Sequence, residues 1–257
     1  MYKDPFSIVY ENDELIAVNK SSGIAVIGDR WDESKERLDD LLIQRVFKTR
    51  KIPDSFRLYT VHRIDRDTSG LVVFAKNAET HKRLSMAFES REVKKKYFAV
   101  IHGRPEWKET VCELHLVADG DKKHRTIIDN YRGKKSLTRF KILGSAGNFS
   151  IVEAIPETGR TPQIRVHLSG LGHPIVCDSL YSRSGQKLVY LSSFKPSWRG
   201  NRYDEKPILS RLGLHAAELS LPDPALELSA PLPKDLKALF QQIAKNGTIQ
   251  NQVPEDL

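Results

Sequence analysis

The chain has little of what disulfide-bonded, zinc-binding or membrane-spanning proteins depend on. Its 257 residues include two cysteines, Cys112 and Cys177, which lie far apart without CxxC spacing, so a disulfide framework and a zinc ribbon are both unsupported. No apolar run is as long as a membrane span, and the first residues lack the apolar core of a signal peptide. We therefore expect a cytoplasmic protein with free thiols, no metal and no contact with a membrane.

The sequence also lacks internal repeats and low-complexity linkers. A chain of this length can bury a substantial core as one large domain or as two small ones. Because no linker divides it, we expect a single catalytic domain over residues 1–257. The polar stretch 248–257 is expected to be a frayed tail.

What the chain does have is an excess of positive charge. Lys and Arg number 41 against 33 Asp and Glu, for a formal net charge of +8. This balance favours polyanionic partners such as RNA, DNA or an anionic membrane. The basic residues gather in four clusters, 48–51, 94–96, 122–125 and 134–135. Each cluster taken alone can equally be a solvated face.

Hydrophobic periodicity predicts short strands with a few helices between them. Apolar and β-branched runs predict strands at 6–10, 15–19, 71–76, 97–101, 111–117, 137–143, 149–155, 187–194 and 214–221. Helical spacing predicts helices at 37–49, 78–89, 163–171 and from Pro233 to Asn246, with Asn77 as the cap of the second. This order indicates an α+β fold, with a mixed, mainly antiparallel sheet flanked by helices.

The run from His62 to Gly70, HRIDRDTSG, is the most informative stretch. It places the carboxylate of Asp65 between Arg63 and Arg66, and the apolar run 71–75 follows at once. Charges this dense beside a core strand are costly unless they pair or bind something. The run therefore predicts a reactive loop anchored to a rigid element.

The same run resembles the signature H-R-[LI]-D-R-x-T-S-G-L of the RluA-type pseudouridine synthases. Four further blocks match that family in order, at 8–20, 95–103, 159–175 and 212–216. The resemblance implies the pseudouridine synthase catalytic fold and isomerisation of uridine in ribosomal or transfer RNA, without a cofactor. Because the first block begins at Ile8, we expect no separate N-terminal RNA-binding domain. The target uridine and the oligomeric state are not readable from the sequence.

The reaction breaks a carbon–nitrogen glycosidic bond and rejoins the base through carbon, which requires a carboxylate as nucleophile or base. Asp65 is the candidate. The resemblance implies that Arg165 lies against Asp65, where its charge would keep the carboxylate ionised despite burial. It also implies that Tyr97 lies on the uracil ring of a uridine flipped out of the RNA.

Other residues are expected to contact the RNA itself. Arg63 matches the arginine that fills the gap left by the flipped base, a role that suits a planar guanidinium. Arg66 and Ile164 are also expected to bind the substrate or the RNA. Lys122 and Lys123 are candidates in the region 108–135, which we predict to be basic and irregular.

Each assignment has a structural alternative that stays open. Asp65 can be an ion-pair partner of a neighbouring arginine, and Arg165 can pair with Asp178 or Glu157. Tyr97 can be a half-buried strand aromatic. His62, His167, His173 and His215 are better interpreted as satisfied core histidines than as metal ligands or bases.

Three other functions compete with the synthase. A catalytically inactive RNA-binding protein of the same fold would fit the charge equally well. A glycosidase would need two carboxylates, which Asp65 and Asp67 could supply. A phosphotransferase is disfavoured, because a kinase catalytic loop needs Asp directly after Arg.

The match to the family departs at three positions. Ser21 replaces a common proline, which predicts a looser turn. Pro162 replaces a common histidine and can fit the first turn of the helix that carries Arg165. Cys177 stands where glycine is common. All three departures leave Asp65, Tyr97 and Arg165 in place.

Overall fold

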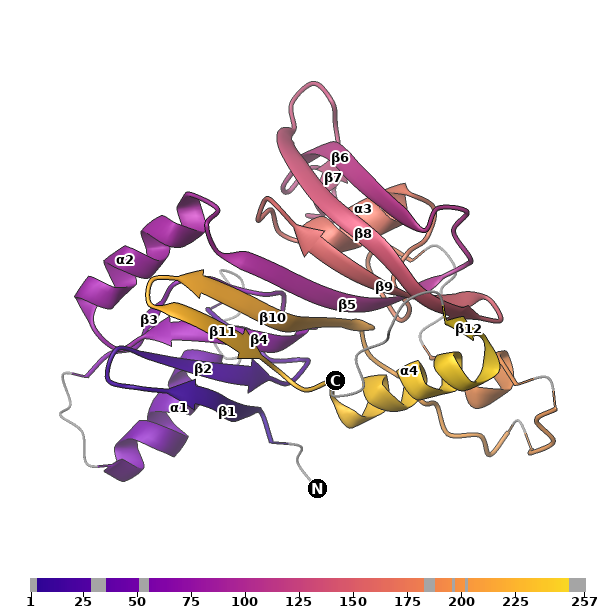
Figure 1. The fold of residues 1–257 in the computed structure, drawn as a ribbon, viewed down its shortest axis with the longest axis horizontal. Helices are drawn as coiled ribbons and strands as arrows, with labels where there is room; N and C mark the ends of the chain where they lie inside the picture. The colour runs from indigo at the N-terminus through magenta and orange to yellow at the C-terminus, as the bar shows by residue number, and fades with distance from the viewer. Residues whose placement is uncertain are drawn as a thin grey trace. The chain divides into compact units, whose positions relative to one another are not determined.

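The computed structural model describes residues 4–28, 36–50, 56–182, 188–195, 197–201 and 203–249. The chain forms two compact units (Figure 1), the first of residues 1–95 with 216–231 and the second of residues 96–215 with 232–257. The boundary falls inside two strands, β5 (Lys94–His102) and β10 (Leu214–Pro222). That the chain acts as one catalytic domain stays a prediction.

The first unit is built on a sheet. Its strands, in spatial order, are β1 (Phe6–Glu11), β2 (Leu15–Lys20), β4 (Ser69–Ala75) and β10, with β3 (Tyr59–Thr60) beside β4 and β11 (Ala225–Ser229) beside β10. The two strands β1 and β2 form an antiparallel hairpin. Its helices are α1 (Leu38–Leu42), which continues as a π-helix (Ile43–Phe47) and a 3₁₀ turn (Lys48–Arg50), and α2 (Ala78–Glu89).

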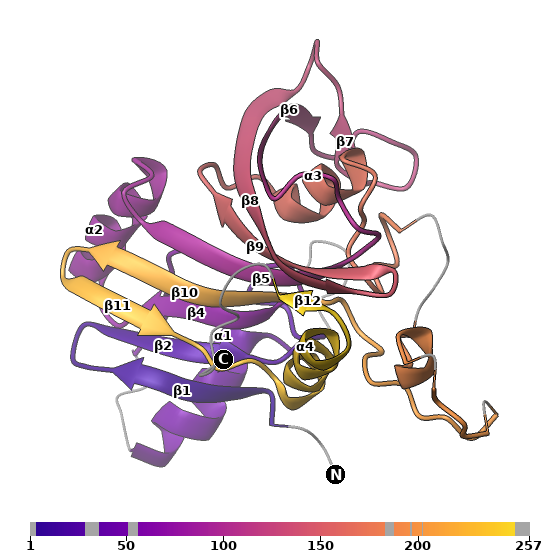
Figure 2. The same ribbon diagram turned by 45° about the vertical axis from the view of Figure 1, so that its right-hand side comes forward.

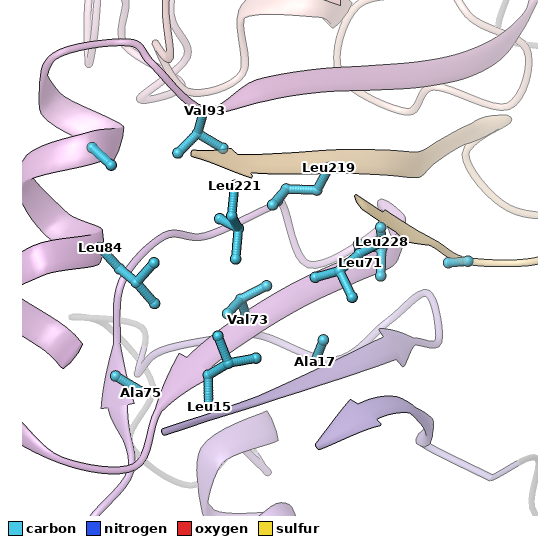
Figure 3. Packing of buried hydrophobic residues seen from close by; sticks show 12 residues of the cluster. Leu15, Ala17, Leu71, Val73, Ala75, Leu84, Val93, Leu219, Leu221 and Leu228 are labelled. Atoms are coloured by element: carbon cyan, nitrogen blue, oxygen red, sulfur yellow. The ribbon is translucent and has the colours of Figure 1, made fainter. Parts of the chain in front are cut away.

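Helix α2 covers the core of this unit. It begins as predicted, because the Asn77 side chain accepts a hydrogen bond from the Thr80 N–H at 2.8 Å. Leu84 points from α2 toward Leu15 and Val73 of the sheet (Figure 3), and all three side chains are fully buried. Burying each of these aliphatic side chains contributes about 1.5–3 kcal/mol. This packing gives β4 a fixed position, and the signature run leads directly into β4.

The second unit is also built on β-strands (Figure 2). Its strands, in spatial order, are β5, β9 (Phe149–Pro156), β8 (Lys134–Ala146), β6 (Glu109–Val117) and β7 (Ile127–Ile128), with β12 (Thr248–Ile249) beside β8. The β5–β9, β9–β8, β8–β6 and β6–β7 pairs are all antiparallel. Its helices are α3 (Gln163–Gly170) and α4 (Lys234–Asn246).

Both helices of the second unit follow the sequence prediction closely. Helix α3 ends at Gly170, and Gly172 has a φ of +84°, which favours glycine. Helix α4 buries Leu236, Leu239, Phe240 and Ile243, which helical spacing places on one face. The Phe240 ring meets Phe98 of β5 edge-on, with the ring centroids 6.2 Å apart. The α+β class with a mainly antiparallel sheet is confirmed.

Two local predictions are wrong. The strand expected at 187–194 is reduced to an isolated bridge between Val189 and Leu209, and Leu191–Ser193 form a 3₁₀ turn in which the Ser192 N–H donates to the Glu205 carboxylate and not to a neighbouring strand. Thr248 and Ile249, expected in the frayed tail, pair with Ser145 and Gly144 at the edge of β8, whose backbone groups need partners. The rest of that tail, 250–257, lies outside the described residues.

Candidate active site

The signature run forms a turn between β3 and β4 in the first unit. The Thr68 N–H donates to the Asp65 carbonyl at 3.1 Å and closes the turn. Ile64 points into the core, whereas Arg63 and Arg66 are exposed and Asp65 is half-buried. The turn therefore presents its cations to solvent and holds the carboxylate at the boundary between core and solvent.

The segment after β2 fixes this turn through its main chain. The Lys20 ammonium and the Gly23 N–H both donate to the Arg66 carbonyl, at 2.9 and 2.8 Å, and the Ser22 hydroxyl donates to the Asp67 carbonyl at 2.7 Å. Lys20 is only 1% exposed. Hydrogen bonds from a charged donor stabilise more than neutral ones do. The backbone that follows Asp65 is thus held at two successive carbonyls.

Sequence reasoning assigned no role to Lys20. The signal available was a lysine at the end of an otherwise largely apolar strand, LIAVNK, in which Leu15, Ile16, Ala17 and Val18 are all buried. A lysine in such a place is buried only when its ammonium finds hydrogen-bond acceptors. That pattern predicts a structural lysine, although it does not name the Arg66 carbonyl as the acceptor.

Ser21 replaces the proline of the family pattern without loosening the segment. Its N–H donates to the Pro5 carbonyl at 2.8 Å, and its hydroxyl donates to the Asp4 carbonyl at 2.8 Å. Proline has no N–H and could not make the first of these bonds. The expected loosening is therefore wrong, because two hydrogen bonds tie Ser21 to the segment that precedes β1.

His62 is a satisfied histidine, as predicted, and is half-buried. Its Nε2 accepts from the Val73 N–H at 3.0 Å, which places the ring proton on Nδ1, and its ring stacks on Phe88 with 4.6 Å between centroids. Burial lowers the pKa of His62 to about 3, and the charge of Lys95 acts in the same direction. The imidazole is neutral at physiological pH and serves to hold β4.

Gly70 marks where the turn passes into β4. Its φ is +119°, and a Cβ there would lie 2.1 Å from the Ala216 carbonyl oxygen of β10. Both facts require glycine.

In the second unit, Tyr97 and Ile164 belong to the same apolar core. Tyr97 pairs with Ala154 of β9 and is half-buried, so the packing expected of a strand aromatic is present. Ile164 is 7% exposed and packs in that core. Its contact with RNA stays a prediction.

Arg165 is held by a buried ion pair. Its Nε and Nη2 donate to the two carboxylate oxygens of Asp178, both at 2.8 Å, in the planar two-bond geometry that suits a guanidinium. Arg165 is 5% exposed and the Asp178 side chain 0%. The Asp178 alternative is therefore confirmed, whereas Glu157 pairs with Arg139.

The loop after α3 shapes this ion pair. Asp178 Oδ1 also accepts from the N–H groups of Leu180 and Tyr181, at 2.9 and 3.1 Å, and the Arg165 guanidinium lies 5.3 Å from the centre of the Tyr181 ring. Cys177, just before Asp178, has a φ of +57°, which explains why glycine is common there. The Asp178 carboxylate thus binds the backbone of this loop and the Arg165 guanidinium at the same time.

Pro162 is compatible with the helix that carries Arg165. It is the N-cap residue of α3, and its carbonyl accepts from the Val166 N–H at 3.2 Å. The helix can start there because the first N–H groups of a helix have no intrahelical partner.

The remaining predicted RNA contacts lie at the surface. Lys122 and Lys123 are exposed in the turn between β6 and β7. The region 108–135 is more regular than expected, since β6 and β7 occupy much of it. Asp65, Arg63 and Arg66 belong to the first unit and the other predicted site residues to the second.

No cofactor or metal site is evident in the part of the chain that the structure describes. Among those residues there is no group of three or more His, Cys, Asp or Glu able to hold a metal ion. No helix among them is long and apolar enough to span a membrane. The expectation of a reaction without cofactor stays a prediction.

The chain is similar to proteins that modify RNA. The family described as RNA pseudouridylate synthase matches residues 14–170. The ribosomal large subunit pseudouridine synthase C of Vibrio vulnificus is 34% identical over 240 residues, which are 92% of this chain and 69% of that protein. The dual-specificity RNA pseudouridine synthase RluA of the same organism is 32% identical over 227 residues, 86% of this chain and 80% of that one.

A solved structure agrees with these matches. The human RNA pseudouridylate synthase domain containing 4 superposes with a TM-score of 0.73 at 26% identity and covers 93% of each chain. The matched family residues include the signature turn around Asp65, the Tyr97 strand and Arg165. The chain therefore belongs to the RluA-type RNA pseudouridylate synthase family and is an isomerase that acts on RNA.

Proposed function

We propose that this protein isomerises specific uridines of ribosomal RNA, in the cytoplasm, with Asp65 as the catalytic carboxylate. The observation that carries the proposal is the way the turn is held. Lys20, Ser22 and Gly23 bind the carbonyls of Arg66 and Asp67. A carboxylate on a main chain fixed in this way keeps its position when a nucleoside approaches, as catalysis requires.

Arg165 is proposed to stabilise the ionised form of Asp65. A guanidinium has five N–H donors, and the bond to Asp178 takes two of them. The ion pair with Asp178 therefore leaves the guanidinium able to serve a second carboxylate. Asp178 would fix the direction of Arg165, and Arg165 would offset the cost of bringing Asp65 out of water.

Tyr97 is proposed to stack on the uracil ring once the nucleotide is flipped out. Its place at the start of β5, beside a packed core, gives the ring a rigid support. Arg63 and Arg66, which are exposed, and Lys122 and Lys123 would bind the RNA around the target. Ribosomal RNA is favoured as substrate by the name of the Vibrio vulnificus synthase C.

The test compares two carboxylates of the same turn. Asp65→Asn is expected to lower the rate of pseudouridine formation more than about a hundred-fold and to leave RNA binding largely unchanged. Asp67→Asn is the matched control, since the Asp67 carboxylate pairs with Arg66 at 3.4 Å and should retain activity. The substrate is ribosomal RNA purified from a strain that lacks this gene, with pseudouridines mapped before and after incubation.

Three results would contradict the proposal. If Asp65→Asn modifies RNA as fast as the unaltered protein, Asp65 is not the catalyst. If the unaltered protein binds RNA and modifies none, the chain is the inactive RNA-binding protein of the same fold. If free uracil is released, the chain is a glycosidase.

A further inference from the structure

The turn between β7 and β8 holds an aromatic side chain in solvent. Tyr131, near the tip of this turn, is 100% exposed. Figure 2 shows the turn standing clear of the strands of the second unit. A tyrosine ring kept in water is accessible to a partner outside this chain.

The turn that carries Tyr131 is rigid. The carboxylate of Asp129 accepts from the N–H groups of Tyr131 and Arg132, at 2.9 and 3.0 Å, and from the Arg132 side chain at 2.7 Å. The Gly133 N–H donates to the Asp129 carbonyl at 2.9 Å. Hydrogen bonds from Arg132 are the main cause that lowers the pKa of Asp129. The ring is thus presented by a fixed backbone.

The turn is also attached to the sheet. The Asp129 N–H donates to the His115 carbonyl of β6 at 2.9 Å. A Cβ on Gly133 would come within 2.5 Å of the His115 carbonyl carbon and 2.4 Å of the Asp129 carbonyl oxygen. Only glycine permits this close approach. The strand β6 therefore fixes the direction in which the turn points.

Basic residues precede and follow Tyr131 along the chain. The three aspartates of this stretch each have a basic partner: Asp119 with His124, Asp121 with Arg125 and Asp129 with Arg132. Lys122, Lys123 and Lys134 are exposed and form no ion pair among the described residues. The surface around β7 therefore carries an excess of positive charge.

We propose that the β7–β8 turn is an RNA-docking element, in which Tyr131 stacks on an unpaired base while Arg132 and Lys134 bind the adjoining phosphates. The proposal rests on the proposed function, because it takes RNA as the partner. An exposed ring among cations fits single-stranded RNA, whose bases offer their faces and whose backbone is anionic. A duplex hides those faces.

The experiment measures binding of a fluorescent 20-nucleotide single-stranded RNA, and of a duplex of the same sequence, by the full-length protein. Tyr131→Ala is expected to weaken binding of the single strand by about five-fold to a hundred-fold. Binding of the duplex should change less than about two-fold. Tyr131→Phe keeps the ring and should bind as the unaltered protein does.

The chain supplies a matched control in Tyr203. This tyrosine belongs to the same unit and is 97% exposed, so Tyr203→Ala removes an equally exposed ring from another loop. It should leave affinity for the single strand unchanged. Both alanine variants should unfold at the same temperature as the unaltered protein, since neither removes buried surface.

Several outcomes would overturn the proposal. These are an unchanged affinity in Tyr131→Ala, an equal loss in Tyr203→Ala, an equal loss for the duplex, or a loss in Tyr131→Phe as large as in Tyr131→Ala. Failure here is distinct from failure of the proposed function. The binding assay requires no catalysis, whereas that function is tested by pseudouridine formation in the Asp65→Asn variant.

Discussion

The signature turn and helix α3 each position a charged residue, and they do so by opposite means. In the first unit, Lys20, Ser22 and Gly23 bind main-chain carbonyls of the turn that carries Asp65. In the second unit, the side chain of Arg165 is itself bound, by the buried carboxylate of Asp178. One arrangement fixes the backbone and the other fixes the charged group.

The difference predicts how each region responds when a substitution removes a binding partner. Loss of a bond to a carbonyl moves the turn but leaves no charge behind, so its cost is moderate. Loss of one partner of a buried ion pair leaves an uncompensated charge out of water, which is far more costly. The two regions are therefore expected to differ in the size and in the kind of effect that a substitution causes.

The largest effect is expected from Asp178→Asn. It removes the carboxylate that the Arg165 guanidinium binds through two buried hydrogen bonds and should lower the free energy of unfolding by about 3–5 kcal/mol. The measurement is chemical denaturation followed by fluorescence. The control is Asp235→Asn, because Asp235 makes the same two-bond contact with Arg211 while 24% of its side chain is exposed. An equal loss in both variants would show that burial does not set the cost.

Lys20→Met should have a smaller effect on stability and a selective effect on activity. It removes the ammonium bonds to the Ser21 and Arg66 carbonyls, at a cost of about 1–3 kcal/mol. Because the turn beside Asp65 is then less restrained, we expect kcat to fall while KM and RNA affinity are kept.

The matched control for Lys20 is Lys76→Met. Lys76 also donates to a carbonyl, that of Asn12 at 2.6 Å, in the same unit but at the far end of β4. The Lys76→Met variant should lose a comparable free energy of unfolding and keep its kcat. If both variants lose kcat equally, Lys20 does not act through the signature turn.

The third prediction concerns pH. His62 has a pKa of about 3 in the folded protein, whereas an unperturbed histidine has one of about 6.5. The unfolded state therefore binds more protons between these values, and stability is lost as the pH falls from about 6.5 toward 3, by up to about 1.4 kcal/mol per pH unit.

His62→Gln isolates this contribution. The glutamine carbonyl can still accept from the Val73 N–H, and the side chain does not titrate. Denaturation midpoints measured between pH 4 and pH 7 should fall less steeply in the variant than in the unaltered protein. His167 of the second unit, whose pKa burial lowers to about 4, remains in both proteins and contributes to the residual slope. Equal slopes would mean that burial does not lower the pKa of His62.

Much of the fold followed from local rules. Asn77 caps α2 because its side chain reaches an N–H three residues on, and α4 buries every fourth or third residue because of helical spacing. The family blocks located Asp65, Tyr97 and Arg165 by residue type alone. Ile164 also lies inside a matching block, and its burial in the core became evident only in the structure.

The sequence by itself determined the family, the reaction class and the elements whose signals lie within a few residues of one another. Tertiary structure alone decided which carbonyl the Lys20 ammonium binds, 46 residues away, and that Arg165 takes Asp178, 13 residues away, and not Glu157. The physical reason is that a hydrogen bond depends on the position and direction of two groups. Propensity and spacing describe each group separately, and only packing brings the two within 3 Å of each other.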